Sequence, residues 1–134
     1  MTPQILTNLR LIDPEADTET EGWLRIEAGR IAEIGEGYRD GTDCGGKVLA
    51  PGIVDIGVKI CEPGERHKES FRTAGAAAAA GGVTTMVTRP DTLPAIDSPE
   101  TLEFVTRRAQ EAAPVNVLTM AALTKGREGR EMVE

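Results

Sequence analysis

The sequence predicts an α/β protein in which short antiparallel strands come first and alternating strands and helices follow. Residues 1–50 contain short apolar runs separated by turn-forming residues. From Pro51 onward, β-branched runs alternate with helical segments, and the connections are short. This order indicates a parallel sheet, and its crossovers fit either the start of a (β/α)₈ barrel or a doubly wound sheet. We therefore divide the chain into 1–50 and 51–134.

The first part is expected to be a set of antiparallel strands. Residues 4–12 alternate imperfectly between apolar and polar side chains, and the acidic loop 13–17 then ends the run. Two further strands, 22–28 and 30–35, flank a turn in which Gly29 supplies the positive φ of a tight hairpin.

The second part is expected to alternate regularly. Its predicted elements are a strand at 53–60, a helix at 68–80 ended by Gly81-Gly82, a strand at 83–88, a helix that begins at Ser98-Pro99, a strand at 115–122, and a helix that begins at 126 and runs toward 134. Ser98 is a good N-cap, and Pro99 suits the first helical position. The alanine run 76–80 is expected to let its helix lie close to neighbouring strands.

Composition excludes several classes of function. The 134 residues are 40% hydrophobic and 28% charged, as is ordinary for a globular domain, and the net charge of −7 argues against binding nucleic acid or an anionic membrane. No apolar run approaches the ~18 residues of a membrane-spanning helix, so we expect a cytoplasmic protein. Cys44 and Cys61 fit no metal-binding spacing and are interpreted as reduced, partly buried structural thiols.

The most informative segment is 51–64, which reads Pro-Gly-Ile-Val-Asp-Ile-Gly-Val-Lys-Ile-Cys-Glu-Pro-Gly. It resembles the first barrel strand of dihydroorotases, Pro-Gly-x-x-Asp-x-His-x-His-x-Arg-Glu-Pro-Gly. The likeness continues at 62–69, 77–85, 89–94, 96–100 and 123–126. Over its whole length the chain is similar to bacterial dihydroorotases of the hydantoinase-like type, within the amidohydrolase superfamily, more than to allantoinases.

The resemblance implies a fold. It is a (β/α)₈ barrel beside a small β-sandwich, with 1–50 as part of the sandwich and 51–134 as the first three βα units. It also implies that further metal ligands lie downstream of Glu134. We therefore expect residues 1–134 to occur within a longer chain, to be complemented by other chains, or to aggregate.

The resemblance also implies that the reactive groups have been replaced. The two zinc-binding histidines of the family correspond to Gly57 and Lys59, and its substrate-binding arginine corresponds to Cys61. In the family block Met-Pro-Asn-Thr-x-Pro at 89–94, the substrate-binding asparagine corresponds to Asp91. Side chains alternate along a strand, so 57, 59 and 61 are expected to share one face.

Glycine has no donor atom, and a lysine ammonium has no lone pair, so we expect no zinc site on this strand. No catalytic residue, metal ligand or substrate anchor is expected in the chain, and no cofactor. We call Asp55, Gly57, Lys59, Cys61 and Asp91 the vestigial site.

For several side chains the sequence allows more than one role. Asp55 is expected to be structural, and His67, the only histidine, to be solvated. Glu62 and Asp91 could form an acid–base pair, although exposed carboxylates are the favoured interpretation. Lys59 is expected either to replace the charge of the lost metal or to extend into solvent.

The leading functional hypothesis is a catalytically silent dihydroorotase homologue that serves as a scaffold partner of aspartate transcarbamoylase in pyrimidine biosynthesis, or that self-associates. The rival hypothesis is an active cyclic-amide hydrolase, with zinc held by later barrel strands, or an enzyme for a cationic or neutral substrate that suits Asp91. A third hypothesis is a fragment without a function of its own.

Overall fold

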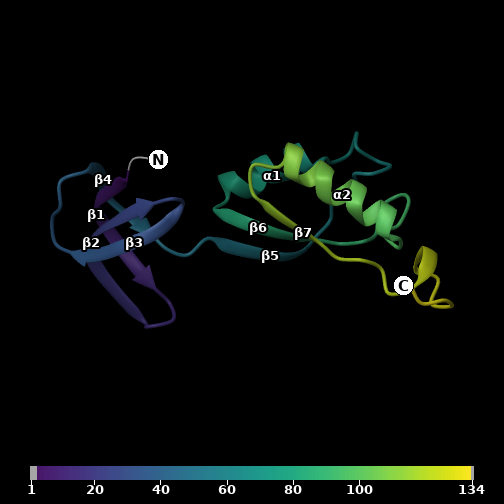
Figure 1. Ribbon diagram of the computed structural model, residues 1–134, viewed down its shortest axis with the longest axis horizontal. Helices are drawn as coiled ribbons and strands as arrows, with labels where there is room; N and C mark the ends of the chain where they lie inside the picture. Colours follow the sequence, from purple (N-terminus) through teal and green to yellow (C-terminus); the bar gives the residue numbers. More distant parts are fainter. Residues whose placement is uncertain (1–2, 134) are drawn as a thin grey trace. The chain divides into compact units, whose positions relative to one another are not determined.

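The computed structural model describes residues 3–133. The chain forms two compact units, Met1–Pro51 and Gly52–Glu134, and each contains its own sheet (Figure 1). None of the helices among the described residues is long and apolar enough to cross a membrane.

The first unit is a four-stranded sheet with the strand order β3-β2-β1-β4. Its strands are β1 (Gln4–Asp13), β2 (Thr18–Glu27), β3 (Arg30–Glu36) and β4 (Thr42–Leu49). β1 pairs antiparallel with β2, and β2 with β3, but β4 pairs parallel with β1. The prediction of antiparallel strands alone is therefore wrong for β4. The β2–β3 hairpin acts as a crossover that returns the chain to the free edge of β1.

Local turn chemistry sets the strand boundaries of this unit. The Asp13 carboxylate accepts hydrogen bonds from the backbone N–H groups of Glu15 and Ala16, at 3.0 and 3.1 Å, so the turn is tight. As a result β2 begins at Thr18, earlier than predicted. The predicted hairpin at 28–29 is confirmed, with φ values of 50° at Ala28 and 75° at Gly29.

The second unit is a three-stranded parallel sheet with the order β5-β6-β7, covered on one side by two helices (Figure 1). Its elements are β5 (Ile53–Val58), α1 (Phe71–Ala80), β6 (Val83–Thr88), α2 (Pro99–Ala112) and β7 (Asn116–Thr119). The predicted alternation of strands and helices is confirmed. Between sheet and helices lies a core of Ile60, Phe71, Ala74, Met86, Ile96, Val105 and Ala109.

Capping determines where the helices begin. α1 begins at Phe71 instead of Lys68, because Ser70 is its N-cap and exchanges hydrogen bonds with Thr73, whose N–H donates to Ser70 Oγ at 3.2 Å. Ser98 caps α2, as predicted, because its Oγ accepts a hydrogen bond from the N–H of Thr101 at 3.3 Å, and Pro99 occupies the first turn.

The alanine run 76–80 does not pack as predicted. Of these five alanines Ala78 alone packs against the core, and the others are exposed. The close approach occurs at Gly75, where an added Cβ would lie 2.7 Å from Pro114 Cδ. The helix is thus brought close to the start of β7 by its one buried glycine.

The predicted helix beginning at 126 is wrong over its described residues, and Glu134 lies outside them. A short 3₁₀ turn, η1 (Lys125–Arg127), is followed by an antiparallel bridge between Thr124 and Met132. Gly126 and Gly129 have φ values of 57° and 74°, which an α-helix does not allow. β7 is also shorter than the predicted strand 115–122.

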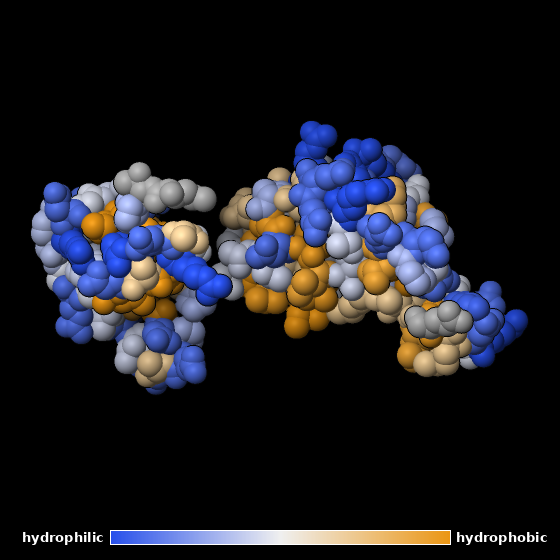
Figure 2. All heavy atoms as spheres, viewed as in Figure 1, coloured by the Kyte–Doolittle hydropathy of each residue, from blue (hydrophilic) through white to orange (hydrophobic). Residues whose placement is uncertain are grey.

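Apolar side chains are exposed along β5, the strand at one edge of the parallel sheet. Ile53, Val54 and Ile56 are 55%, 56% and 71% exposed. Figure 2 shows hydrophobic atoms gathered on the part of the second unit where β5 lies.

Candidate functional site: a charged cluster at the carboxyl ends of two parallel strands

The segment that contains the vestigial site leaves the sheet earlier than predicted. β5 ends at Val58, and its pairing with β6 is irregular between Ile56 and Val58, where Gly57 has a φ of 95°. Lys59 and Cys61 therefore lie in the loop after the strand, and strand alternation does not govern them. The prediction that 57, 59 and 61 share one strand face is wrong, because the positive φ at Gly57 breaks the alternation.

Lys59 and Asp91 nevertheless meet. The Lys59 ammonium donates to Asp91 Oδ2 at 3.2 Å, and the Arg89 guanidinium donates to the same oxygen at 3.0 Å. Lys59 follows β5 directly, and Arg89 follows β6 directly. The N–H of Arg89 donates to the carbonyl of Val58 at 2.9 Å, which extends the pairing of the two strands by one hydrogen bond.

This arrangement keeps Asp91 ionised. Its side chain is 10% exposed, and burial raises the pKa of the carboxyl, but the hydrogen bond from Lys59 and the charges of Arg89 and Lys59 lower it, with a net decrease. Asp91 Oδ1 is buried and has no hydrogen-bond partner among the described residues. Oδ2 therefore carries both ion pairs.

Glu62 is a second buried carboxylate, and the prediction that it is solvent-exposed is wrong. Oε1 accepts a hydrogen bond from Arg108 Nε at 2.7 Å, and Oε2 accepts one from the backbone N–H of Phe71 at 3.0 Å. The Glu62 side chain is 5% exposed. Burial raises the pKa of Glu62. The hydrogen bonds from Arg108 and Phe71 and the charges of Arg108 and Arg66 outweigh this effect, so the net pKa is below its ordinary value. With both oxygens engaged, Glu62 is a structural link between its loop and the two helices.

The remaining candidates stay apart from this chemistry. His67 is exposed, as predicted. Asp55 is exposed on β5 and has no side-chain hydrogen bond within residues 3–133. Cys44 and Cys61 are half-buried free thiols, as expected.

These residues do not fit the zinc ion that the resemblance implies. Gly57 offers no ligand atom, and the Lys59 ammonium has no lone pair and is paired with Asp91. Nowhere in residues 3–133 do three or more His, Cys, Asp or Glu side chains gather in a way that could hold a metal ion.

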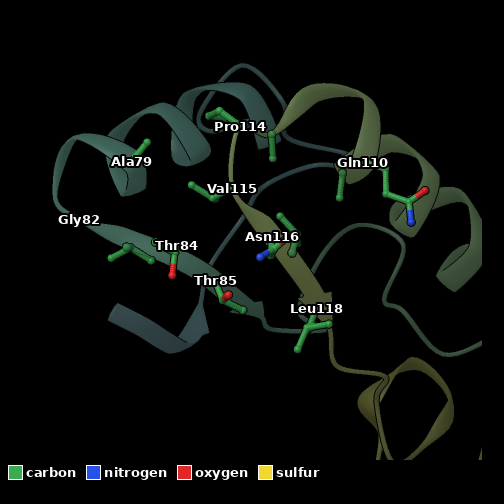
Figure 3. A pocket seen from close by; sticks show the side chains of 13 residues that line it. Ala79, Gly82, Thr84, Thr85, Gln110, Pro114, Val115, Asn116 and Leu118 are labelled. Carbon is green, nitrogen blue, oxygen red and sulfur yellow. The ribbon is translucent and has the colours of Figure 1, made fainter. Parts of the chain in front are cut away.

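A groove of about 920 Å³ lies elsewhere, near the amino ends of β6 and β7 (Figure 3). Its polar side chains in the close-up are those of Thr84, Thr85, Gln110 and Asn116, and none of the described residues that line it is ionisable. In parallel α/β folds, ligand chemistry belongs to the carboxyl ends of the strands, so this groove is not the candidate site.

Sequence reasoning missed two residues of the charged network, Arg89 and Arg108. Arg89 stands where the family block has methionine, so two unusual charges in one short block were the available signal. Arg108 gave no such signal, because its partner Glu62 lies 46 residues away.

The comparison with known proteins agrees with the resemblance. The dihydro-orotase-like family model matches residues 46–134. The chain is 44% identical over 124 residues to a dihydroorotase from Wolbachia sp. subsp. Drosophila simulans (strain wRi), an alignment that covers 88% of this chain and 28% of the relative. It is 40% identical over 139 residues to a dihydroorotase-like protein from Pseudomonas putida, with 100% of this chain and 32% of the relative covered.

The solved structures support the same conclusion. An L-hydantoinase from Arthrobacter aurescens superposes with a TM-score of 0.80 at 25% identity, over 92% of this chain and 28% of that protein. The predicted fold class is confirmed, since the chain matches the N-terminal part of a hydantoinase-type barrel protein. The chain thus spans less than a third of the length of these relatives. On the family match over 46–134 and the identities above, the chain belongs to the dihydroorotase-like family of amidohydrolases.

Proposed function

We propose that the protein to which this chain belongs is a catalytically silent dihydroorotase homologue of pyrimidine biosynthesis, which acts as a scaffold partner of aspartate transcarbamoylase. The observation that carries the proposal is the ion pair between Lys59 and Asp91. The resemblance assigns a metal ligand to the first position and a substrate anchor to the second. Here the two residues neutralise each other instead.

The structural frame around these positions supports the proposal. Glu62 accepts hydrogen bonds from the backbone N–H at the start of α1 and from the side chain of Arg108, so the loop after β5 is linked to both helices. A protein with an intact frame and substituted reactive positions is suited to binding a partner rather than to hydrolysis.

The test uses the full-length protein. After dialysis, its zinc content and its turnover of dihydroorotate are measured, and a sample purified with added zinc serves as the control. We expect less than stoichiometric zinc and no turnover in either sample. Co-sedimentation with aspartate transcarbamoylase then tests the scaffold role. About one equivalent of zinc together with turnover would contradict the silent assignment, and separate sedimentation would contradict the partner.

The second candidate function is an active cyclic-amide hydrolase whose ligands come from later barrel strands. It is favoured by the names of the relatives, which include dihydroorotases at 44% and 40% identity. The same zinc and turnover measurements distinguish it from the silent scaffold.

A further inference from the structure

The charged cluster after β5 and β6 contains more positive than negative charge. Lys59 and Arg89 share one oxygen of Asp91, so one carboxylate compensates two cations. Both cationic side chains remain about half exposed, at 53% and 51%, whereas Asp91 is 10% exposed. The ammonium has three N–H groups and the guanidinium five, so most donors of the pair are not used by Asp91.

Among residues 3–133, no other carboxylate forms an ion pair with Lys59 or Arg89. The pKa of Glu65 is lowered mainly by the hydrogen bond from Lys68, with which it is paired, and the charge of Lys59 makes the smallest contribution. Glu62 is occupied by Arg108 and by the N–H of Phe71. The positive charge of Lys59 and Arg89 therefore faces solvent in a chain with a net charge of −7.

The position of the pair in the fold favours a ligand. Both residues directly follow adjacent parallel strands, at the carboxyl edge where α/β sheets bind ligands (Figure 1). The space next to the end of β5 is also open. A Cβ added to Gly57, two residues before Lys59, would have no atom within 4 Å.

Asp91 is not suited to contact such a ligand itself. Its free oxygen, Oδ1, is buried, and Oδ2 is already shared by the two cations. Its effect is to hold the ammonium and the guanidinium near one point. Asp91 is thus a positioning residue for the pair.

We infer that Lys59 and Arg89 together bind a small oxyanion, a carboxylate or phosphate group, at the carboxyl ends of β5 and β6. The inference rests on the proposed function in one respect, because a cation at position 59 has replaced a metal ligand. Guanidinium binds both oxyanions through paired N–H donors, and lysine adds a compact charge. The ligand is held by side chains that the family does not use for this purpose.

Titration of the full-length protein tests the inference, with inorganic phosphate in one arm and malonate in the other, both in the presence of a chelator. Binding is followed by calorimetry and by the shift in thermal unfolding. We expect saturable binding in at least one arm, and the tighter arm identifies the oxyanion. Binding should weaken at least tenfold in Lys59→Met and in Arg89→Met. Arg107→Met, which removes an exposed arginine of α2, should bind as the parent does.

Charge-conserving variants keep the test decisive if the methionine variants fail to fold. Lys59→Arg and Arg89→Lys should bind within a few-fold of the parent. Absence of saturable binding in both arms, or equal weakening by Arg107→Met, would overturn the inference. That failure is separable from failure of the proposed function, since zinc content and turnover are measured without added anion. If the protein binds the anion and also contains zinc and hydrolyses dihydroorotate, the anion site is supported and the proposal that the protein is catalytically silent is contradicted.

Discussion

Arg108 on α2 donates from Nε to Glu62 Oε1 across 2.7 Å, although the two residues are 46 positions apart in the sequence. The other Glu62 oxygen accepts the backbone N–H of Phe71, the first residue of α1. One carboxylate therefore joins the loop after β5 to both helices of the second unit.

Replacing Glu62 is expected to destabilise this unit. Glu62→Gln should lower the free energy of unfolding by about 1–3 kcal/mol, because Arg108 loses a buried charged acceptor. Denaturant unfolding of the full-length protein measures the change. Glu111→Gln is the matched control, since that carboxylate is exposed and lies 3.8 Å from the same arginine. Equal effects of the two substitutions would show that burial of Glu62 is unimportant.

Stability is expected to fall in acid. The pKa values of Glu62 and Asp91 are lower in the folded chain than their ordinary values, which are about 4.3 and 3.9. Their contribution is therefore fully present above those ordinary values and is lost as the pH falls through the lower folded-state values. Unfolding midpoints between about pH 7 and pH 3 measure this loss. The Glu62→Gln variant should show a shallower decline, and an unchanged decline would contradict the assignment.

Removing the Lys59 ammonium should raise the pKa of Asp91 toward its ordinary value. In Lys59→Met, Arg89 alone remains to stabilise the buried carboxylate. Carboxyl carbon chemical shifts followed through an acid titration report the pKa of Asp91 directly. Lys68→Met removes a lysine that pairs with Glu65 instead, and it should leave the pKa of Asp91 unchanged. If the Asp91 pKa does not move in Lys59→Met, Lys59 is not its charge partner.

Replacing Gly57 by a residue with a side chain is expected to lower the stability of the folded protein. Its φ of 95° lies in the region that favours glycine, so Gly57→Ala should lower stability by about 1–2 kcal/mol. Gly81→Ala is the control, because Gly81 has a φ of −87° and 3.6 Å of clearance for a Cβ.

The same backbone constrains any attempt to restore a metal site. Gly57→His with Lys59→His should gain some metal binding, with reduced stability and little turnover, because Cys61 and Asp91 do not anchor a carboxylate. Metal analysis and dihydroorotate hydrolysis measure both properties. Robust turnover from the histidine pair alone would contradict the assignment of the anchors.

Gly75 is expected to reverse the usual effect of alanine in a helix. Gly→Ala in a helix interior ordinarily stabilises by about 1 kcal/mol. Here the new Cβ would lie 2.7 Å from Pro114 Cδ and 3.2 Å from Ala113 Cα. Gly75→Ala should therefore destabilise the unit by about 1–3 kcal/mol, as measured by thermal unfolding. A gain in stability would show that Pro114 and Ala113 can shift to accommodate the added Cβ at little energetic cost.

The sequence predicted elements with strong local signals and failed where distant partners decide. Ser98 and Pro99 predict the start of α2, and Ala28-Gly29 predict a hairpin. These signals are reliable because a helix cap and a positive φ depend on residues that are adjacent in the sequence. The sequence favours an exposed Glu62, because no residue near it in the chain indicates that Arg108 is its partner. The segment after 126 was expected to be helical, but its glycines adopt positive φ, and the Gly126 N–H donates to Asp97, 29 residues away, at 2.7 Å.

The site shows the same division. Position-by-position comparison with the family block identified Gly57, Lys59 and Asp91 as altered. It did not predict that Lys59 and Asp91 are partners, because they are 32 residues apart and follow different strands. The irregularity of β5 at Gly57 was equally hidden, since the sequence there still reads as a β-branched run.

The parallel pairing of β1 with β4 has a consequence for the order in which the first unit assembles. The hairpins β1–β2 and β2–β3 close over short turns, whereas the β1–β4 pairing joins Leu6 to Thr42. Closing the longer loop costs more chain entropy, so the meander should form first and β4 should dock last. Pulse-labelled hydrogen exchange during refolding would then find the amides of β2 protected before those of β4.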